Sequence, residues 1–374
     1  MRPIKMVDLQ TQYLHIKKEV DESIEKVLAA TDFIQGKAVG DFENALSQYM
    51  GGTHVISCGN GTDALQIAMM ALNFKPGDEI ILPVHTYVAT AEVIALLQLA
   101  PVFADVDEST FTLDVSKVES LITKRTVAIV PVHLYGQCAD MNSIIALAKK
   151  YNLHLIEDAA QSLSADYVFP DGQKGKAGTL GIIGTTSFFP TKNLGAFGDG
   201  GAMFTSDHSL AEKLRMIANH GQKTKYQHDL VGVNSRLDTL QAAILQVKLA
   251  HLNEYSQKRR DVAAYYDAHL SEVKFLRIPH KVSYSTHVYH QYTVIVKDID
   301  RDMLKFFLQK KGIPSMIYYG TPLHLQPAYQ RKNFGNGTFP IAEKLSKTVL
   351  SLPIHTEMDA EQLSYICESV KSFD

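Results

Sequence analysis

The sequence predicts an α/β protein with a large domain and a smaller C-terminal one. From about residue 42, short runs rich in β-branched residues alternate with helical segments whose apolar residues recur every three or four positions. This alternation is typical of a mostly parallel sheet with helices on both faces. The chain has 374 residues, of which 45% are hydrophobic. It therefore exceeds the usual single-domain length and can bury a sizeable core.

The first forty residues are expected to form an approach arm. Apolar residues share one face of a helix predicted over about 14–30, namely Ile16, Val20, Ile24 and Val27. Gly36 and Gly40 then interrupt the helical pattern. The arm is assigned to the large domain.

The middle of the chain supplies the predicted sheet. Strands are expected at 54–57, 79–82, 101–106, 127–132 and 153–157. The intervening helices are expected at 63–72, 89–99 and 141–151. Residues 167–184 are rich in Gly and Lys and indicate an irregular hairpin.

The last third of the chain is expected to leave the large domain and form the small one. Residues 237–270 carry apolar residues at three- and four-residue spacing and predict one long helix. Beyond it we expect a strand at 289–296 and helices at 302–311, 341–350 and 360–370. We place the large domain at 1–249 and the small domain at 250–374.

Composition excludes several classes of protein. The formal net charge is −3 with mixed signs and no basic run, which argues against nucleic acid or an anionic membrane as the main ligand. The three cysteines, Cys58, Cys138 and Cys367, are few and widely spaced and form no metal-binding pattern with each other or with histidine. They suit a reducing cytosol. The N-terminus lacks the apolar core of a signal peptide, and no stretch approaches the roughly 20 apolar residues of a membrane span, so a soluble cytoplasmic protein is expected.

A lysine in apolar surroundings is the first candidate catalytic group. Lys192 follows the strand-like run 187–189 and precedes a glycine-rich loop, 195–201. Desolvation disfavours the ammonium form, so such a lysine can become an amine nucleophile for a Schiff base. The alternative is a solvated loop lysine, and taken alone this stretch favours that alternative.

Two further stretches would suit a phosphate-bearing aromatic cofactor. In residues 57–65 a strand runs through a small-residue turn into a helix, where backbone N–H groups and the Thr62 hydroxyl can hold a phosphate. A plain capped helix start is the alternative. Residues 153–162 form a buried strand that ends near Asp158 and Gln161. Asp158 can keep a pyridinium nitrogen protonated, unless it only caps the next helix, and Gln161 can bond a ring hydroxyl.

Together these stretches resemble the pyridoxal-phosphate aminotransferases of the DegT/DnrJ/StrS family, which act on nucleotide-linked keto sugars. The resemblance extends over nearly the whole chain in eight ordered motifs: CGNGTDAL at 58–65, PVHTYVATAE at 83–92, PVHLYGQCAD at 131–140, IEDAAQS at 156–162, TSFFPTKNLGAFGDGGA at 186–202, HGQ at 220–222, VGVNSRLDTLQAAIL at 231–245 and TPLHLQPAY at 321–329. It implies the aspartate-aminotransferase-like fold of type I pyridoxal-phosphate enzymes, with a seven-stranded sheet in the large domain. The motifs are most similar to bacterial transaminases that aminate C3 of UDP-2-acetamido-2-deoxy-3-oxo-hexuronate in surface-polysaccharide biosynthesis, such as that of lipopolysaccharide.

The resemblance also assigns roles to residues of this sequence. Lys192 would carry the cofactor and move protons as base and acid, and Asp158 would protonate the ring nitrogen. The other implied cofactor contacts are Gly61, Thr62, Tyr87, Gln161, Ser187 and Asn234. Asn234 would reach the cofactor of a neighbouring subunit, which implies a homodimer with shared active sites.

The remaining implied residues concern the substrate. Arg236, Tyr319 and His324 are the candidate substrate contacts, and Arg236 offers a fork for the carboxylate of the sugar or of glutamate. L-glutamate is the implied amino donor. The sequence departs from the family at Gly320, where proline usually follows the tyrosine, and at Thr191, where glycine or serine is usual.

Three alternatives remain at the level of sequence. The alternative substrate is a dTDP-linked 3-keto- or 4-keto-6-deoxyhexose, with which the motif at 324–329 is also associated. Family members that dehydrate sugars carry histidine in place of the lysine, so Lys192 argues against that reaction. A non-catalytic regulator or binding module that keeps the fold would be expected to lose Lys192 or Asp158, and both are present.

Overall fold

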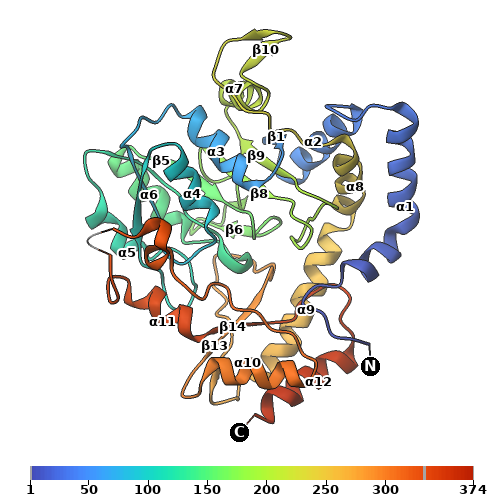
Figure 1. Cartoon of the computed structure of the whole chain (residues 1–374), viewed down its shortest axis with the longest axis vertical. Coiled ribbons are helices and arrows are strands. Elements are labelled where there is room, and N and C mark those ends of the chain that lie inside the picture. Colours follow the sequence, from blue (N-terminus) through green and yellow to red (C-terminus); the bar gives the residue numbers. More distant parts are fainter. Residues whose placement is uncertain (1, 332–333, 374) are drawn as a thin grey trace.

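The computed structural model describes residues 2–331 and 334–373 and contains a central sheet of seven strands in the order β1-β9-β8-β5-β4-β2-β3 (Figure 1). Only β9 runs antiparallel to its neighbours, whereas β8, β5, β4, β2 and β3 are mutually parallel. The strands are β1 His54–Cys58, β2 Glu79–Pro83, β3 Ala100–Ala104, β4 Thr126–Ile129, β5 His154–Asp158, β8 Ile183–Ser187 and β9 Gly201–Thr205. The predicted seven-stranded, mostly parallel sheet is therefore confirmed.

Helices cover both faces of this sheet because successive strand residues point to opposite sides. In β2, Ile80 and Leu82 pack in one apolar cluster, and Ile81 between them packs in another. The first cluster lies under α3 Gly61–Ala71, α4 Ala89–Leu96 and α7 His208–Ala218. On the other face lie α2 Lys37–Tyr49, α6 Met141–Tyr151 and α8 Thr239–Ala250, with the short α5 Val115–Val118 nearby.

A second, antiparallel sheet has three strands and lies towards the end of the chain. It is built from β12 Leu276–Arg277, β13 Tyr292–Val296 and β14 Val349–Leu352. The helices around it are α9 Leu252–Leu270, α10 Arg301–Lys310, α11 Pro340–Thr348 and α12 Ala360–Lys371. Two small hairpins complete the strands: β6 Asp166–Val168 with β7 Lys174–Lys176, and β10 Gln222–Thr224 with β11 Gln227–His228. The hairpin expected within 167–184 is confirmed by β6 and β7.

The N-terminal arm reaches the C-terminal part of the chain. Helix α1 Leu9–Ala30 packs on α8 through Ile16, Val20 and Ile244. Ahead of α1, Ile4 joins the apolar cluster around α9 and α12, and Arg2 pairs with Asp359 at 2.9 Å. Both termini lie at the same end of the molecule (Figure 1). The division at residues 249 and 250 stays a prediction.

Three predicted elements differ from the structure. The predicted long helix is two helices, α8 and α9, which meet at His251. There the backbone hydrogen bond spans three residues, because the His251 N–H bonds Lys248 O at 3.1 Å. Gly40 does not interrupt a helix but lies inside α2. Val349 and Leu350 leave the predicted helix and pair with β13 instead, since tertiary pairing outweighs local periodicity there.

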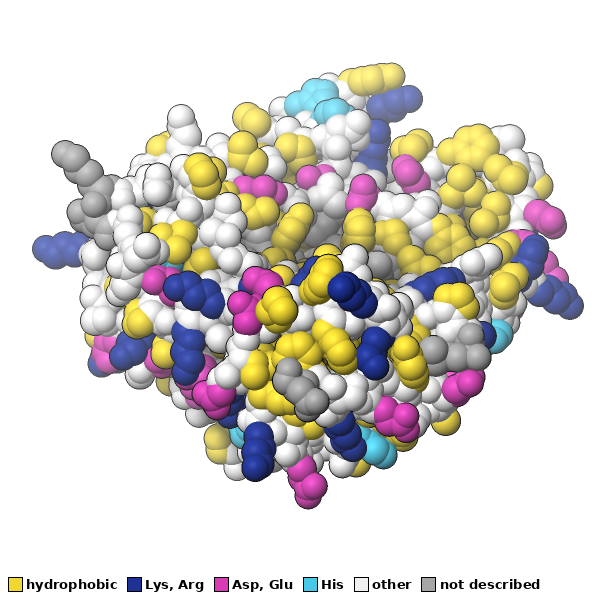
Figure 2. All heavy atoms as spheres, turned by 60° about the horizontal axis from the view of Figure 1, so that its bottom comes forward, with side chains coloured by type: hydrophobic (Ala, Val, Ile, Leu, Met, Phe, Trp, Pro, Cys, Tyr) yellow, Lys and Arg dark blue, Asp and Glu magenta, His cyan; other side chains and the backbone are white. Residues whose placement is uncertain are grey.

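The surface is mixed in charge. On the face drawn in Figure 2, Lys and Arg side chains are interspersed with Asp and Glu. None of the helices in the described part combines the length and apolar character that a bilayer crossing requires.

Candidate active site

The carboxyl ends of parallel strands bring the candidate residues to one edge of the sheet. In the parallel pair β5 and β8, Asp158 lies opposite Thr185, two residues before Ser187. Strand β1 leads at the same edge into the turn at Gly59 and Asn60 and then into α3. This edge is where parallel α/β sheets bind ligands.

The start of α3 forms a cradle for an anion. The Asn60 side chain caps the helix by accepting a bond from Asp63 N at 2.8 Å. In the part of the chain that the structure describes, the N–H groups of Gly61 and Thr62 have no recorded partner, as expected for a helix start. A Cβ on Gly61 would lie 2.7 Å from Ser187 Cβ, so only glycine permits this approach. Free N–H groups next to the Ser187 hydroxyl fit a phosphate group.

Lys192 lies in the loop that follows β8 and is partly buried. Its backbone N–H bonds Phe189 O at 2.8 Å. Burial lowers the pKa of Lys192 from 10.5 to about 8, and the charge of Asp158 partly opposes this shift. No side-chain hydrogen bond or ion pair of Lys192 is recorded among the described residues. Its amine is therefore available in the neutral, nucleophilic form close to neutral pH.

Asp158 is held rigidly at the end of β5. The carboxylate is 6% exposed and accepts bonds from Thr90 Oγ1 at 2.8 Å and from Ala160 N at 3.2 Å. Each oxygen keeps a second lone pair for a further donor, such as a pyridinium N–H. Turns rather than an α-helix follow Asp158, so helix capping does not account for its position.

Gln161 joins two segments that are far apart in the sequence. Its Oε1 accepts a bond from Tyr135 N at 2.7 Å, and its Nε2 donates to Tyr319 Oη at 3.1 Å. The Tyr319 ring lies 6.0 Å from the ring of Tyr87, whose side chain is 55% exposed. The exposed face of Tyr87 suits stacking on an aromatic ring.

The segment 234–236 lies against the anion cradle. Between two predicted site residues, Ser235 accepts a bond from Gly59 N at 2.9 Å and donates to Asp63 Oδ2 at 2.6 Å. Asn234 is exposed and Arg236 partly so. No ion pair of Arg236 is recorded within the described residues, so its guanidinium can receive a carboxylate.

The structure does not support substrate binding by His324. That side chain is fully buried, its Nε2 lies 3.1 Å from Glu343 Oε1, and its ring packs 4.8 Å from the ring of Phe339. Packing of the loop at 323–325 against α11 removes His324 from the surface. The sequence identifies His324 but does not show that its side chain is buried against Glu343.

Three residues that contact the site were not identified from the sequence. Thr90 bonds Asp158, Ser235 bonds the turn at Gly59, and the backbone of Tyr135 bonds Gln161. Each lies inside one of the family motifs, at 83–92, 231–245 and 131–140. The motifs pointed to these stretches, but the partners became visible only in the fold.

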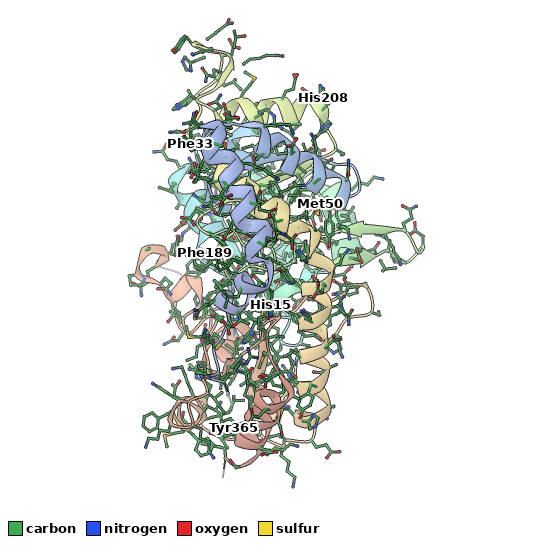
Figure 3. All side chains as sticks on the ribbon, turned by 90° about the vertical axis from the view of Figure 1, so that its right-hand side faces the viewer. His15, Phe33, Met50, Phe189, His208 and Tyr365 are labelled. Carbon is green, nitrogen blue, oxygen red and sulfur yellow. The ribbon has the colours of Figure 1, made fainter. Side chains whose placement is uncertain are left out.

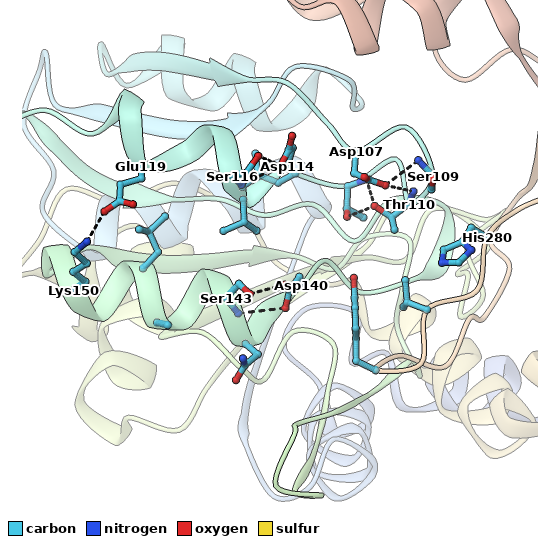
Figure 4. A pocket seen from close by; sticks show the side chains of 18 residues that line it. Asp107, Ser109, Thr110, Asp114, Ser116, Glu119, Asp140, Ser143, Lys150 and His280 are labelled. Atoms are coloured by element: carbon cyan, nitrogen blue, oxygen red, sulfur yellow. Dashed lines mark hydrogen bonds and ion pairs between the residues drawn. The ribbon is translucent and has the colours of Figure 1, made fainter.

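A large cavity lies elsewhere and shares no lining residue with this site (Figure 4). It is an open groove of about 970 Å³ beside α6. Its carboxylates are already used locally: Asp107, Asp114 and Asp140 accept bonds from nearby backbone N–H groups. The chemistry of the chain therefore points to the sheet edge and not to the groove.

Comparison with known proteins agrees with this geometry. Residues 14–371 match the DegT/DnrJ/EryC1/StrS aminotransferase family. A UDP-2-acetamido-2-deoxy-3-oxo-D-glucuronate aminotransferase of Pseudomonas aeruginosa is 45% identical over 98% of this chain and 99% of its own length. A protein of Geobacillus stearothermophilus described as a pleiotropic regulatory protein is also 45% identical, over 99% of this chain and 98% of its own.

A solved structure extends the similarity to the fold. The crystal structure of S. venezuelae DesV in complex with a ketimine intermediate superposes with a TM-score of 0.94 at 38% identity, covering 99% of this chain and 98% of that one. The predicted aminotransferase fold is thereby confirmed.

Proposed function

Because the chain belongs to the DegT/DnrJ/EryC1/StrS aminotransferase family, whose enzymes use pyridoxal 5′-phosphate, we propose that it transfers an amino group from L-glutamate to C3 of UDP-2-acetamido-2-deoxy-3-oxo-hexuronate. The observation that carries the catalytic part is the meeting of Lys192, Asp158 and the anion cradle at one sheet edge. The relative from P. aeruginosa supports the choice of sugar.

The residues of the chain have distinct tasks in this reaction. When bound, pyridoxal phosphate supplies an electron sink for the proton transfers. Gly61, Thr62 and Ser187 hold its phosphate, and the Asp158 carboxylate keeps its ring nitrogen protonated. The Lys192 amine, with its pKa lowered to about 8, takes the proton from the donor's α-carbon and later returns a proton, acting as base and then acid.

Arg236 is the proposed contact for the substrate's carboxylate. It follows Ser235, whose bonds to Gly59 and Asp63 tie the segment to the anion cradle. A planar guanidinium without a recorded partner among the described residues offers two parallel bonds to a carboxylate. Asn234 and Tyr87 are proposed to contact the cofactor, and Tyr319 the sugar.

A coupled assay with L-glutamate tests the substrate. The UDP-linked 3-oxo-hexuronate is compared with a dTDP-linked 3-keto-6-deoxyhexose in the native protein and in Arg236→Ala. We expect only the uronate to be aminated, and Arg236→Ala to lower its kcat/KM by about 10- to 100-fold. Arg260→Ala, which removes a guanidinium bonded to Gln257 on α9, is the matched control. Better turnover of the neutral sugar would keep the transaminase chemistry and reject this substrate.

A regulatory function is the second candidate, because one relative is described as a pleiotropic regulatory protein. A regulator would need the fold but not the side-chain amine of Lys192. Lys192 with its lowered pKa and the rigidly held Asp158 both favour the enzyme. A yellow protein whose visible absorbance disappears on borohydride reduction would show a cofactor linked to a lysine, and a colourless protein that cannot be loaded would favour the regulator.

We also propose a homodimer with shared active sites. Apolar side chains are exposed on α1, just after it and on the Lys192 loop: Leu28 at 50%, Phe33 at 44% and Phe189 at 50%. Phe33 and Phe189 lie on the side of the molecule that α1 covers (Figure 3). A second copy of the chain would bury these exposed apolar side chains. The exposed Asn234 would then reach the partner's cofactor.

A cytoplasmic, polysaccharide-related role is proposed on chemical grounds. Nucleotide-linked sugars are activated donors, and a 3-amino uronate is suited to incorporation into a surface glycan such as lipopolysaccharide. All three cysteines are unpaired and buried, which is consistent with a reducing compartment.

A further inference from the structure

The segment from Met316 to Leu323 crosses the site. Backbone hydrogen bonds hold both of its ends, whereas its middle is not held in this way. Met316 exchanges bonds with Ser351, at 3.1 Å from its N and 2.7 Å to its O. At the other end Leu323 N bonds Val84 O at 3.0 Å. For 317–321, no backbone N–H has a recorded partner among the residues that the structure describes. The position of this middle part must therefore depend on side chains.

Side-chain bonds attach the middle of the segment, and two of them reach it from Tyr135 and Gln161 at the edge of the large sheet. The Tyr135 hydroxyl donates to Tyr318 O, and Gln161 Nε2 donates to Tyr319 Oη at 3.1 Å. The two bonds hold adjacent residues, so together they fix the position and the orientation of the Tyr319 side chain. That ring faces Tyr87, the residue proposed to stack on the cofactor.

Tyr135 contributes to both attachments. Its hydroxyl makes the first bond, and its backbone N–H bonds Gln161 Oε1 at 2.7 Å, which turns the amide so that Nε2 faces Tyr319. Its backbone has φ of +60°, a left-handed conformation that non-glycine residues seldom adopt. The tertiary structure thus holds Tyr135 in a demanding conformation next to the site.

The surroundings of the Tyr135 ring restrict it further. The ring is 2% exposed and packs edge-on against Phe111 at 5.1 Å. His85 Nε2 lies 3.3 Å from the hydroxyl, and burial lowers the pKa of His85 to about 4, so this neighbour is neutral at physiological pH. The hydroxyl donates to the carbonyl of Tyr318, and its oxygen can accept a bond from His85 Nε2.

We propose that Tyr135 is a positioning residue that sets Tyr319 over the substrate side of the active site without touching the substrate. The inference rests on the proposed function, since it assigns Tyr319 to the sugar. It goes beyond that function by naming the residue that places the sugar contact.

Hydrogen exchange tests the structural part independently of any substrate. Tyr135→Phe removes the bond to Tyr318 O and leaves the backbone bond to Gln161, so the Met316 and Leu323 amides, which are hydrogen-bonded at the two ends of the segment, should exchange at least about 5-fold faster. Tyr266→Phe is the matched control, because the buried Tyr266 hydroxyl also donates to a carbonyl, Pro353 O at 2.8 Å, far from the site. Unchanged exchange of the Met316 and Leu323 amides, or the same change in the control, overturns the inference.

Steady-state kinetics test the functional part. Tyr135→Phe should raise KM for the keto sugar about 5-fold while kcat stays within about 2-fold. In a Tyr319→Phe background the same substitution should change KM less than about 2-fold, because Tyr135 acts through Tyr319. An unchanged KM, or full additivity of the two substitutions, overturns the role. If the native protein aminates no keto sugar, the proposed function fails, while the exchange experiment still decides whether Tyr135 holds the segment.

Discussion

At the scale of single residues, the chemistry depends on an amine and a carboxylate that the fold treats differently. Lys192 is partly buried, and its pKa falls to about 8 although the charge of Asp158 partly opposes this shift. Asp158 is more deeply buried and receives two hydrogen bonds, which hold its carboxylate in place. The pair thus combines an amine that loses its proton near pH 8 with a nearby carboxylate held in place by hydrogen bonds.

Replacing Lys192 should abolish turnover and spare the fold. Lys192→Ala removes the only proposed base, so we expect kcat to fall by on the order of 10⁴-fold or more, with an unchanged circular dichroism spectrum. Lys174→Ala, at an exposed lysine on β7, should keep native activity. Activity close to native in Lys192→Ala would reject the assigned chemistry.

The pKa of Lys192 predicts a pH profile for loading the apoprotein with pyridoxal phosphate. Only the neutral amine reacts, so loading should be fast above pH 8. Below pH 8 the loading rate should fall about tenfold for each pH unit. Asp158 raises this pKa, and removing its charge should therefore lower the midpoint. The rate is followed by absorbance between pH 6 and 10, with Lys192→Ala as the blank. A midpoint near 10.5 would mean that burial does not control the lysine.

At the scale of elements, the start of α3 and the end of β8 act as one unit. The glycine at the helix start lets the two segments touch, and it leaves the first N–H groups pointing into the cradle. The helix dipole adds to the attraction for an anion. Cofactor affinity is therefore a property of this contact, and it can be tested without the amino donor or the sugar.

A methyl group at Gly61 should weaken the cofactor site. The Cβ of Gly61→Ala would lie 2.7 Å from Ser187 Cβ and push the helix start away, so pyridoxal phosphate should bind at least about tenfold more weakly.

The control for Gly61→Ala is Gly40→Ala inside α2, where nothing lies within 4 Å of the added Cβ. That variant should bind normally and gain about 0.5–1 kcal/mol in its free energy of unfolding, because alanine favours a helix. Equal cofactor affinity of Gly61→Ala and the native chain, measured by titration, would contradict the cradle.

At the scale of the whole molecule, exposed apolar side chains on the Lys192 loop and on α1 are the candidates for a contact between two chains. Phe189 is 50% exposed three residues before Lys192, and Leu28 is 50% exposed on α1. Exposing this surface to water is unfavourable, whereas a second copy would bury it. The cofactor site would then be completed by the partner.

A charge on this surface should separate the dimer. Leu28→Asp places a carboxylate among apolar residues, so sedimentation should shift from the mass of two chains to that of one, and activity should fall on dilution. Met303→Asp changes a side chain that is 59% exposed on α10 and should leave both properties unchanged. A dimer that survives Leu28→Asp would place the interface elsewhere.

The sequence by itself determined the order of elements and the stretches that carry the chemistry. Alternation of strands and helices predicted the sheet because local periodicity records which face of each element is buried. The motifs located Lys192, Asp158 and the start of α3 because close backbone approach and strand ends demand particular residues at fixed spacings.

The tertiary structure decided what depends on distant partners. It broke the long helix at His251, turned 349–350 into a strand edge, buried His324 against Glu343, and brought Tyr135 and Gln161 onto the segment at 318–319. None of these follows from local pattern, because each is the outcome of competition between hydrogen-bond and packing partners that lie far apart along the chain. The sequence thus identified the reacting groups, and only the folded chain could show which residues hold them in place.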